Sequence, residues 1–410
     1  MMMNNTISKI VDNTISNSMD NAADNIPQGY KKTVLGVIPE DWEVVKLGDV
    51  VTVTTGSKNT QDKIKNGKYL FFVRSQTIER INTYSFDGEA ILTAGDGVGV
   101  GKVFHYINGR FDFHQRVYKI SDFNPNINAR FLYWYFSRFF YDRVMKMNAK
   151  TSVDSVRLDM IVGMQIPLPK NILEQQKIAE IISCWDNTIS KQEALIKQKQ
   201  LFKKVVMQQI FSQQLRFKAD DGSDYPDWEE KRLGELISCL DHKRKPLNSE
   251  QRANITGIIP YYGANGVVDY ITDFIFNEEL VLLAEDGGNF DDYKNKPIAQ
   301  YITGKAWVNN HAHVIKGKDS ISTKFIFYSL VHKDIRAWIN GTSRSKLNKT
   351  DMLCIIVNVP LSVKEQQKIA DFLTSIDEQI ELLKQELEQL RLQKKSLMQK
   401  LLTGRVRVKL

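Results

Sequence analysis

Loops that mix basic, amide and aromatic side chains carry the clearest chemistry in this sequence. Such side chains hydrogen-bond base edges and phosphates, so the mixture is typical of nucleic-acid binding. Each loop alone is also typical of an ordinary solvated surface, but their recurrence at matching places in both halves favours a DNA interface. The candidate DNA-binding residues are Arg74, Gln76, Lys102, His114, Gln115, Arg116 and Lys150, then Lys243, Arg244, Lys245, Tyr261, Tyr262, Asn265, Asn310, His313, Arg344 and Lys346.

Other stretches resemble catalytic or cofactor sites but fail on context. The glycine-rich run 95–101 does not fit GxGxxG and leads into a β-type run, which argues for a hairpin or a close backbone approach to a ligand. The acids of 226–231 are too compressed to surround an ion, so we interpret them as a turn entering a strand. His311 and His313 are expected on one face of a strand, and no third ligand is evident. We therefore predict no metal site.

The motifs that would indicate a catalytic centre are also absent from the sequence. The sequence has no Walker-type phosphate loop and no Asp/Asn-Pro-Pro-aromatic methyltransferase motif. We predict that the chain is not an enzyme and binds no cofactor of its own.

The elements that must position these loops are duplicated. The hexapeptide EQQKIA occurs at 174–179 and again at 365–370, each time after a proline-containing stop and before a long apolar-periodic segment. An Asp-Trp pair followed by Leu-Gly also recurs, at 41–48 and 227–234. Internal repetition outranks a local motif in deciding architecture. The chain is thus predicted to alternate globular unit, helix, globular unit, helix.

Both long segments carry an a/d heptad seam, the pattern of a helix that packs on another helix. We expect the second helix to be roughly 57 Å long at 1.5 Å per residue. An alternative is that each helix packs on its own neighbouring domain or on another chain. The predicted helix-pairing residues are Ile178, Ile182, Trp185, Ile189, Ile196, Val206, Ile210, Ile369, Leu373, Ile376, Ile380, Leu383, Leu387, Leu390, Leu397 and Leu401.

Charge favours an antiparallel orientation of the two helices. Residues 174–190 carry three acids and one base, and 191–217 carry one acid and six bases. Residues 363–390 carry seven acids and three bases, whereas 391–410 carry seven bases and no acid. Antiparallel pairing sets the basic half of one helix against the acidic half of the other, and flanking charges of this kind select orientation.

Composition sets the remaining limits. A chain of 410 residues is too long for one simple core. There is no apolar run of membrane-spanning length, no signal peptide, and the three cysteines are far apart, so we expect a cytoplasmic, reduced protein. Net charge +8 permits a polyanionic partner. Short β-type runs in both units (69–73, 103–106, 116–120; 267–271, 280–283, 312–315) precede aromatic helix-like segments at 129–147 and 323–338.

The doubled Pro-stop and EQQKIA helices, with the Trp and Leu-Gly pairs ahead of them, resemble the specificity (S) subunits of type I restriction-modification enzymes, the HsdS family. The resemblance covers residues 30–410. It implies an α+β fold with two small mixed α/β target recognition domains, each followed by a long helix, and an antiparallel coiled coil with a pseudo-twofold internal repeat. The expected domains are a flexible N-terminal arm (1–28), target recognition domains (29–170 and 218–362), spacer helices (171–217 and 363–402) and a basic C-terminal tail (403–410). Weak helix is expected around 7–15.

For function, the resemblance implies that each recognition domain reads half of a split, asymmetric double-stranded DNA site, with the helices as spacer. Two modification (M) subunits would carry S-adenosylmethionine and methylate adenine, and two restriction (R) subunits would use ATP and Mg²⁺. The coil length sets an upper limit of about 17 base pairs on half-site separation. The alternative from the residues alone is a protein-binding scaffold with paired domains on a coiled coil, and a further one is a stand-alone enzyme such as a nuclease.

Overall fold

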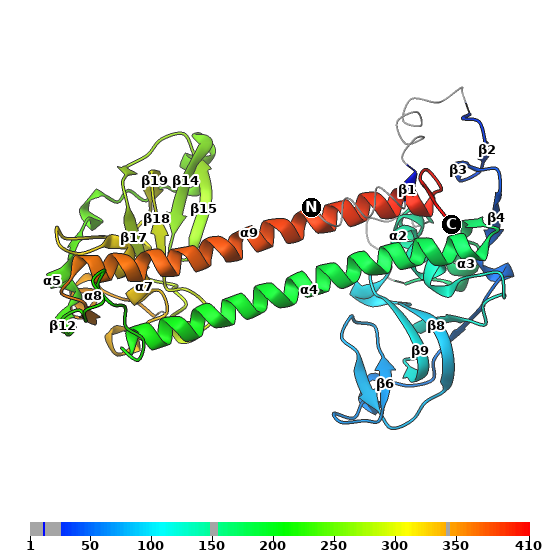
Figure 1. Ribbon diagram of the computed structural model, residues 1–410, viewed down its shortest axis with the longest axis horizontal. Helices are drawn as coiled ribbons and strands as arrows, with labels where there is room; N and C mark the ends of the chain where they lie inside the picture. The colour runs from blue at the N-terminus through cyan, green and yellow to red at the C-terminus, as the bar shows by residue number, and fades with distance from the viewer. Residues whose placement is uncertain (1–10, 13–25, 148–154, 342–344) are drawn as a thin grey trace. The chain divides into compact units, whose positions relative to one another are not determined.

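The computed structural model describes residues 11–12, 26–147, 155–341 and 345–410. The chain forms two compact units, shown in Figure 1. Unit 1 comprises Met1–Glu193 with Glu386–Leu410, and unit 2 comprises Ala194–Gln385. Each unit therefore contains one end of each long helix, which confirms the predicted α+β class with an internal repeat.

Unit 1 is built around a six-stranded sheet. Its strand order is β5-β10-β8-β9-β6-β7, with β6 parallel to β9 and the other pairs antiparallel. Two small pairs, β2-β3 and β11-β4, complete it. The strands are β2 (Tyr30–Thr33), β3 (Gly36–Pro39), β4 (Trp42–Lys46), β5 (Thr52–Thr55), β6 (Tyr69–Phe72), β7 (Glu79–Ile81), β8 (Phe86–Ala94), β9 (Phe104–Phe113), β10 (Val117–Ser121) and β11 (Gln165–Pro169).

Unit 2 divides its strands between two four-stranded sheets and one pair. The orders are β13-β20-β17-β18, β15-β14-β19-β16 and β12-β21. The strands are β12 (Glu229–Arg232), β13 (Ile237–Cys239), β14 (Thr256–Gly263), β15 (Gly266–Ile271), β16 (Phe276–Asn277), β17 (Leu280–Ala284), β18 (Ala299–Ile302), β19 (Lys305–Val308), β20 (Ala312–Gly317) and β21 (Ile356–Val359).

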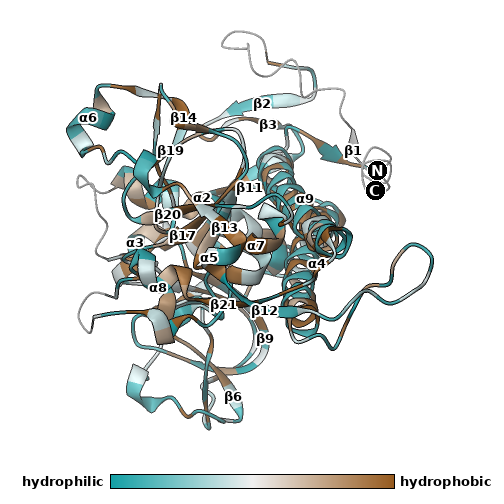
Figure 2. Cartoon of the chain, turned by 90° about the vertical axis from the view of Figure 1, so that its left-hand side faces the viewer, coloured by the Kyte–Doolittle hydropathy of each residue, from teal (hydrophilic) through white to brown (hydrophobic). Residues whose placement is uncertain are grey.

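Helices cover these sheets and connect the units. Unit 1 holds α2 (Ala129–Met147) and α3 (Leu158–Val162). Unit 2 holds α5 (Leu233–Leu236), α6 (Ser249–Ala253), α7 (Thr323–Leu330) and α8 (Lys349–Leu353). The long helices are α4 (Ile172–Phe211) and α9 (Val363–Leu402). Both show hydrophilic and hydrophobic residues around their length in Figure 2, as expected for a helix with one apolar stripe.

Contacts inside each unit confirm the antiparallel pairing of α4 with α9. In unit 1, Arg391 on α9 lies 2.7 Å from Glu193 on α4. In unit 2, Lys199 on α4 donates to Gln379 on α9 at 3.0 Å. As α4 residue numbers rise, their α9 partners' numbers fall, which only an antiparallel pair produces.

The helix ends also belong to the cores of the units. The largest core in unit 1 joins Ile178 and Ile182 of α4 to Leu401 of α9 and to the aromatic face of α2. The matching core in unit 2 joins Val206 and Ile210 to Ile369, Leu373, Ile376 and Ile380. Packing on the neighbouring domain, which stood as an alternative to helix pairing, thus occurs together with it.

Other seam positions differ in burial. Trp185, Ile196 and Leu387 are buried, whereas Ile189, Leu383, Leu390 and Leu397 are half-buried. Met207 and Met398 are buried although they lie outside the predicted seam. The seam widens at the ends of the helices because domain side chains cover a second stripe there.

Several predicted elements need correction. The segment 403–410 is not a free basic tail, because Val406 and Val408 are buried and β22 (Arg407–Val408) pairs with β1 (Val11–Asp12). The same pair replaces part of the weak helix expected around 7–15; the remainder of that helix, and most of the predicted arm, lie outside the described residues. The aromatic helix expected over 323–338 ends at Leu330 and is followed by a 3-10 turn, Arg336–Trp338. The first long helix, predicted over 171–217, ends earlier, at Phe211.

Candidate nucleic-acid interface

The first residue of the repeated hexapeptide anchors each helix to its unit. In unit 1, Glu174 accepts hydrogen bonds from the indole of Trp42 at 3.3 Å and from Arg407 at 2.7 Å. Arg407 also contacts Asp41 at 2.7 Å. Glu174 is buried. A buried carboxylate is tolerated only when it is paired and hydrogen-bonded, and here a neutral and a charged donor do this.

Unit 2 repeats this arrangement with its own residues. Glu365 is fully buried and accepts from the Trp228 indole at 3.1 Å and from Arg216 at 3.2 Å. Arg216 also lies 3.3 Å from Asp227. The Asp-Trp pair and the helix-opening glutamate therefore recur together because they are one anchor.

The glutamine that follows closes the loop before each helix. Gln175 donates to the carbonyl of Pro169 at 2.8 Å and accepts from the Asn128 backbone at 2.7 Å, just ahead of α2. Gln366 donates to the carbonyl of the proline before α9 at 2.9 Å and accepts from the Ser322 backbone at 2.8 Å, just ahead of α7. Both side chains are buried and both amide ends are satisfied.

A shared set of backbone hydrogen bonds at one end of each sheet, the frame, holds the candidate DNA-binding loops. In unit 1 the Gly95 N–H donates to the Arg116 carbonyl at 2.8 Å, and the Gly95 carbonyl accepts from Val156 at 2.7 Å. In unit 2 Glu285 makes the same two bonds, to His311 at 2.9 Å and from Leu347 at 2.7 Å. The frame brings three loops of each unit together.

Three charged residues meet on this frame in unit 1. Asp96 lies 2.7 Å from Arg74 and 3.6 Å from Arg116. Both arginine side chains are largely exposed, and Gln76 and Gln115 beside them are exposed too. Lys102 is exposed with its ammonium 5.6 Å from the Tyr141 ring centre. These side chains form a polar, net basic surface.

In unit 2 the corresponding surface is concave. A hollow of about 520 Å³ is lined by the β14–β15 turn, the loop after β17 and the loop 309–311. Tyr261, Asn265 and Asn310, three of the predicted residues, line it. Asp286 and His311 line it as well, joined by a contact of 2.6 Å between a carboxylate oxygen and Nδ1.

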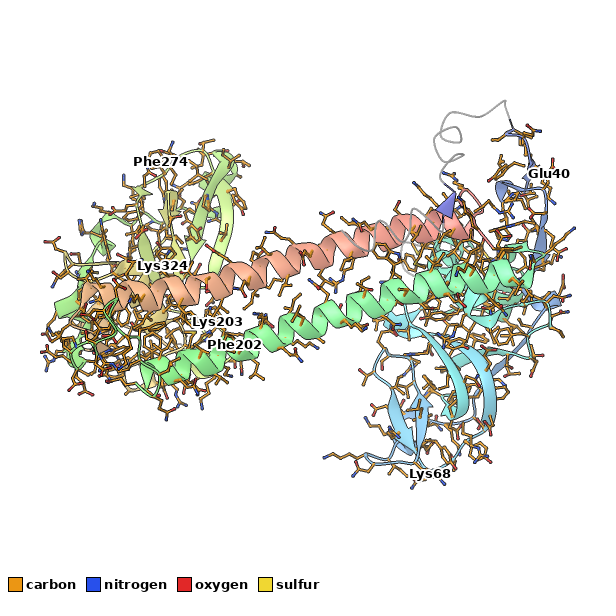
Figure 3. The ribbon with its side chains drawn as sticks, in the orientation of Figure 1. Glu40, Lys68, Phe202, Lys203, Phe274 and Lys324 are labelled. Atoms are coloured by element: carbon orange, nitrogen blue, oxygen red, sulfur yellow. The ribbon has the colours of Figure 1, made fainter. Side chains whose placement is uncertain are left out.

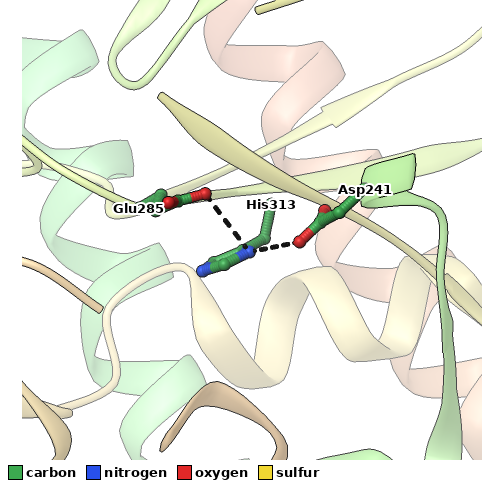
Figure 4. Close-up of side chains that lie close together, drawn as sticks. All are labelled: Asp241, Glu285 and His313. Atoms are coloured by element: carbon green, nitrogen blue, oxygen red, sulfur yellow. Dashed lines mark hydrogen bonds and ion pairs between the residues drawn. The ribbon is translucent and has the colours of Figure 1, made fainter. Parts of the chain in front are cut away.

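Next to Asp286 in the chain, Glu285 belongs to a largely buried polar network, drawn in Figure 4. Nδ1 of His313 lies 2.7 Å from the Asp241 carboxylate and 3.7 Å from that of Glu285. Nε2 of the same ring lies 2.8 Å from the Leu347 carbonyl. Both ring nitrogens thus face acceptors, which is the pattern of an imidazole that donates from both.

This network corrects our view of the histidines. His313 does have two further ligating side chains within reach, since its nitrogen and the oxygens of Asp241 and Glu285 lie within 4.8 Å of one another. However, Arg244 lies 2.6 Å from Glu285 and 3.4 Å from Asp241. The guanidinium supplies the cationic charge that a metal ion would bring, so the described residues favour an ion-pair network.

The acid in this network is held ionised. Burial by itself raises the pKa of Asp241, but hydrogen bonds from His313 and from the Val314 N–H, together with the charges of His313 and Arg244, outweigh it and lower the pKa below its ordinary value. The network therefore ties three loops of unit 2 together, since Asp241, Glu285 and Leu347 each come from a different one, and the loop that holds Glu285 also lines the hollow through Asp286.

Four of the predicted DNA-binding residues make contacts inside their unit and do not project from its surface. His313 and Tyr261 are 1% exposed and His114 is 5% exposed, so none can lie flat on a DNA surface. Arg244 is committed to its two carboxylates. Sequence could not show this, because burial of a polar residue depends on partners distant in the chain.

The other predicted residues of unit 2 lie at the surface. Lys243, Lys245 and Lys346 are exposed, and Lys346 lies 3.2 Å from Glu285, while Tyr262 is half-buried. Lys150 and Arg344 lie outside the described residues. Sequence analysis missed Asp96 and Asp286; the shared Ala-x-Asp-Gly core was the one signal that could have found them.

Comparison with known proteins agrees with this architecture. The family model described as the type I restriction modification DNA specificity domain matches residues 39–199 and 225–392. The chain therefore belongs to this family, and is a non-catalytic specificity subunit. A specificity subunit of the type I restriction enzyme MjaVIII from Methanocaldococcus jannaschii is 26% identical, over 91% of this chain and 94% of its own.

Further relatives point the same way. A putative type I restriction enzyme specificity subunit from Haemophilus influenzae is 36% identical, over 38% of this chain and 39% of its own. The crystal structure of the S subunit from M. genitalium has a TM-score of 0.62 at 18% identity, covering 88% of this chain and 96% of that one. That likeness shows a shared fold. Among the described residues, no helix combines the length and apolar composition needed to cross a membrane.

Proposed function

We propose that this chain reads a split, asymmetric DNA site, with each unit reading one half. Working in the cytoplasm with modification subunits that carry S-adenosylmethionine, it directs adenine methylation of that site. With restriction subunits that use ATP and Mg²⁺, it directs cleavage of unmodified DNA. The chain itself contributes recognition and holds no cofactor.

One observation carries this proposal. The two units share the same helix anchors and the same strand-end frame, yet the side chains on the frame differ, with Arg74 and Arg116 in one and His311 and Asn310 in the other. A constant frame with variable polar loops is what two different base-reading specificities require.

Methylation-site sequencing tests the proposal. DNA exposed to this chain with its modification subunit and S-adenosylmethionine should carry methyl-adenine in both halves of an interrupted motif. Absence of modification, with a modification subunit that is active on another specificity chain, would contradict the proposal.

Two variants test the modular part of the idea. Exchanging residues 218–362 for those of another family member should change one half-site and leave the other unaltered. A seven-residue insertion in both α4 and α9 adds two helical turns and keeps the seam in phase, so it should lengthen the spacer alone. A change in both half-sites after the exchange would argue against one unit per half.

The competing candidate is a protein-binding scaffold, favoured by the exposed apolar side chains of α4. Phe202, labelled in Figure 3, and Leu201 are 49% and 62% exposed. Salt separates the two functions, because a DNA complex that neutralises several phosphates weakens steeply as salt rises. A flat response would favour the scaffold.

A further inference from the structure

Register places one acidic and one basic residue at the same point in both units. In unit 1 Ala94 of β8 pairs with Val117 of β10, and in unit 2 Ala284 of β17 pairs with Ala312 of β20. Asp96 and Asp286 each lie two residues beyond the first alanine. Arg116 and His311 each directly precede the second member of the pair. These positions are equivalent although the loops around them differ.

The acidic residue contacts the basic residue in both units. Asp96 lies 3.6 Å from Arg116 and also holds Arg74 at 2.7 Å, one carboxylate oxygen to each arginine. Asp286 lies 2.6 Å from Nδ1 of His311. The acids are mostly covered, at 21% and 16% exposure, whereas Arg116 and His311 are 63% and 42% exposed.

Stability does not account for these pairs. Ion pairs whose basic member is this exposed contribute little to the stability of the fold, because solvent screens them. Nor does simple attraction to phosphate, because a neighbouring carboxylate weakens the pull of a cation on an anion. An acid that fixes the orientation of a basic side chain suits the uncharged edge of a base, where the direction of each hydrogen bond carries the information.

We propose that Arg116 and His311 are equivalent base-reading residues, one for each half-site, and that Asp96 and Asp286 are the positioning residues that aim them. This rests on the proposed function and adds to it the two side chains that set the base. Arg116, with Arg74 beside it, presents a planar donor fork that matches O6 and N7 of guanine.

His311 has a different chemistry. Its Nδ1 donates to the Asp286 carboxylate, so in the neutral ring Nε2 is an acceptor. An acceptor at this point fits the exocyclic amino group of adenine or cytosine. The two units would therefore differ in the base they read through one position on a common frame.

Methylation-site sequencing of variants, each with the modification subunit, tests this. With Arg116→Ala, one guanine-containing pair in one half-site should lose discrimination by about 10- to 100-fold while the other half-site is unchanged. Arg116→Lys keeps the charge but loses the fork, so the position should stay relaxed. Asp96→Asn should relax the same position less strongly. His311→Ala and Asp286→Asn should relax one position in the opposite half-site.

Matched controls lie near the opposite ends of β8 and β17. Arg110 is an exposed arginine 2.8 Å from Asp87 on β8, and Lys316 is an exposed lysine 2.7 Å from Glu278 beside β17. Arg110→Ala and Lys316→Ala should leave the motif intact.

The outcomes separate this inference from the function beneath it. If the unaltered chain yields no interrupted motif, the proposed function fails and this inference fails with it. If the unaltered chain yields the motif but Arg116→Ala and His311→Ala preserve it, only the inference fails. Rescue of Arg116→Ala by Lys, or a uniform loss of methylation without a changed motif, would show phosphate contacts and would also overturn it.

Discussion

Units 1 and 2 solve one structural problem with different side chains. In unit 1 the hydroxyl of Tyr118 donates to the Val156 carbonyl at 3.2 Å. In unit 2 the ring of His313, at the equivalent strand position, makes the same contact with the carbonyl of Leu347 at 2.8 Å. A polar side chain on the strand ties down the loop that follows, and its identity is free to vary.

The neighbouring strand adapts to that choice. A Cβ atom at Gly95 would lie 3.1 Å from the Tyr118 ring and 2.9 Å from the Arg116 carbonyl oxygen, so a larger residue there would crowd both neighbours. The smaller imidazole of His313 admits Glu285, and with it Arg244. The comparison teaches that the two surfaces differ by coupled pairs of residues on a shared backbone frame.

The anchors should be the most sensitive point of the shared frame. Glu365→Ala removes the buried acceptor that Arg216 and Trp228 share, although Arg216 keeps Asp227, and loss of one partner from a buried ion pair costs about 3–5 kcal/mol. Glu174→Ala should cost unit 1 a similar amount. Hydrogen exchange resolved by peptide should show each substitution loosening its own unit. Equal loosening of both units by either one would contradict the idea of separate, equivalent anchors.

Substitution of Gly95, which is coupled to Tyr118, should have the next largest effect on stability. Gly95→Ala forces the new methyl group against Tyr118 and the Arg116 carbonyl, and overpacking of this kind costs about 1–3 kcal/mol. Chemical denaturation of the variant measures the loss. The double variant Gly95→Ala, Tyr118→Ala should lose less stability than the sum of the losses in the two single variants, since the contact with the ring is gone. Strict additivity would show that the glycine and the tyrosine are not coupled.

The lysines that interrupt the helix seam give a smaller effect. Lys394 pairs with Asp186 and its ammonium lies 4.5 Å from the Trp134 ring centre; Lys203 pairs with Asp377 and lies 5.4 Å from that of Tyr328. Figure 3 labels Lys203 on α4.

Lys394→Met should therefore destabilise unit 1 by about 0.5–2 kcal/mol, the range of a partly desolvated cation over an aromatic ring. Lys203→Met should do the same in unit 2. Denaturation of the two variants side by side measures this, with exposed Lys395→Met as the control. A more stable Lys394→Met variant would mean that the lysine is a defect in the seam.

Acidification gives the smallest expected change. Burial, followed by the charge of Arg74, lowers the pKa of His114, so the folded state binds fewer protons at this site than the unfolded chain does. Its contribution to stability is complete above about pH 6.5 and falls as the pH drops below that value.

Asparagine can replace Nδ1 as the acceptor of the Arg116 N–H, at 2.9 Å in the native contact. His114→Asn should therefore lose less stability than the native chain between about pH 7.5 and about pH 5.5 in urea unfolding. The pKa of His332 in unit 2 is also lowered by burial, and this residue is unchanged in the variant, so its part of the pH dependence should persist. An unchanged pH dependence would mean that His114 does not titrate in this range.

Much of the architecture could be read from residue order. Heptad spacing and the charge asymmetry of the two helices were sufficient to predict an antiparallel pair, because helix faces and end charges depend on local sequence alone. Helix α2 was predicted with its observed bounds for the same reason. Strand β8 was missed, since its first half carries Asp87, Gly88 and Glu89, residue types that are depleted in strands.

The site was less predictable. Arg74 and Arg116 were predicted because basic residues in polar loops are visible in sequence, and both are exposed, whereas the predicted His313 and Tyr261 are buried. Lys394 interrupts the apolar seam, and only the structure shows its partners, Asp186 and Trp134.

The sequence by itself determined the duplication, the helix phase and orientation, and the family, since each of these is written in spacing and repetition. Tertiary structure alone decided which polar residues face solvent and which hold loops together. Asp241 meets His313, and Arg407 meets Glu174, across distances in the chain that no local pattern spans. The physical reason is that a buried charge is acceptable only beside its partner, and folding, not spacing, brings that partner into place.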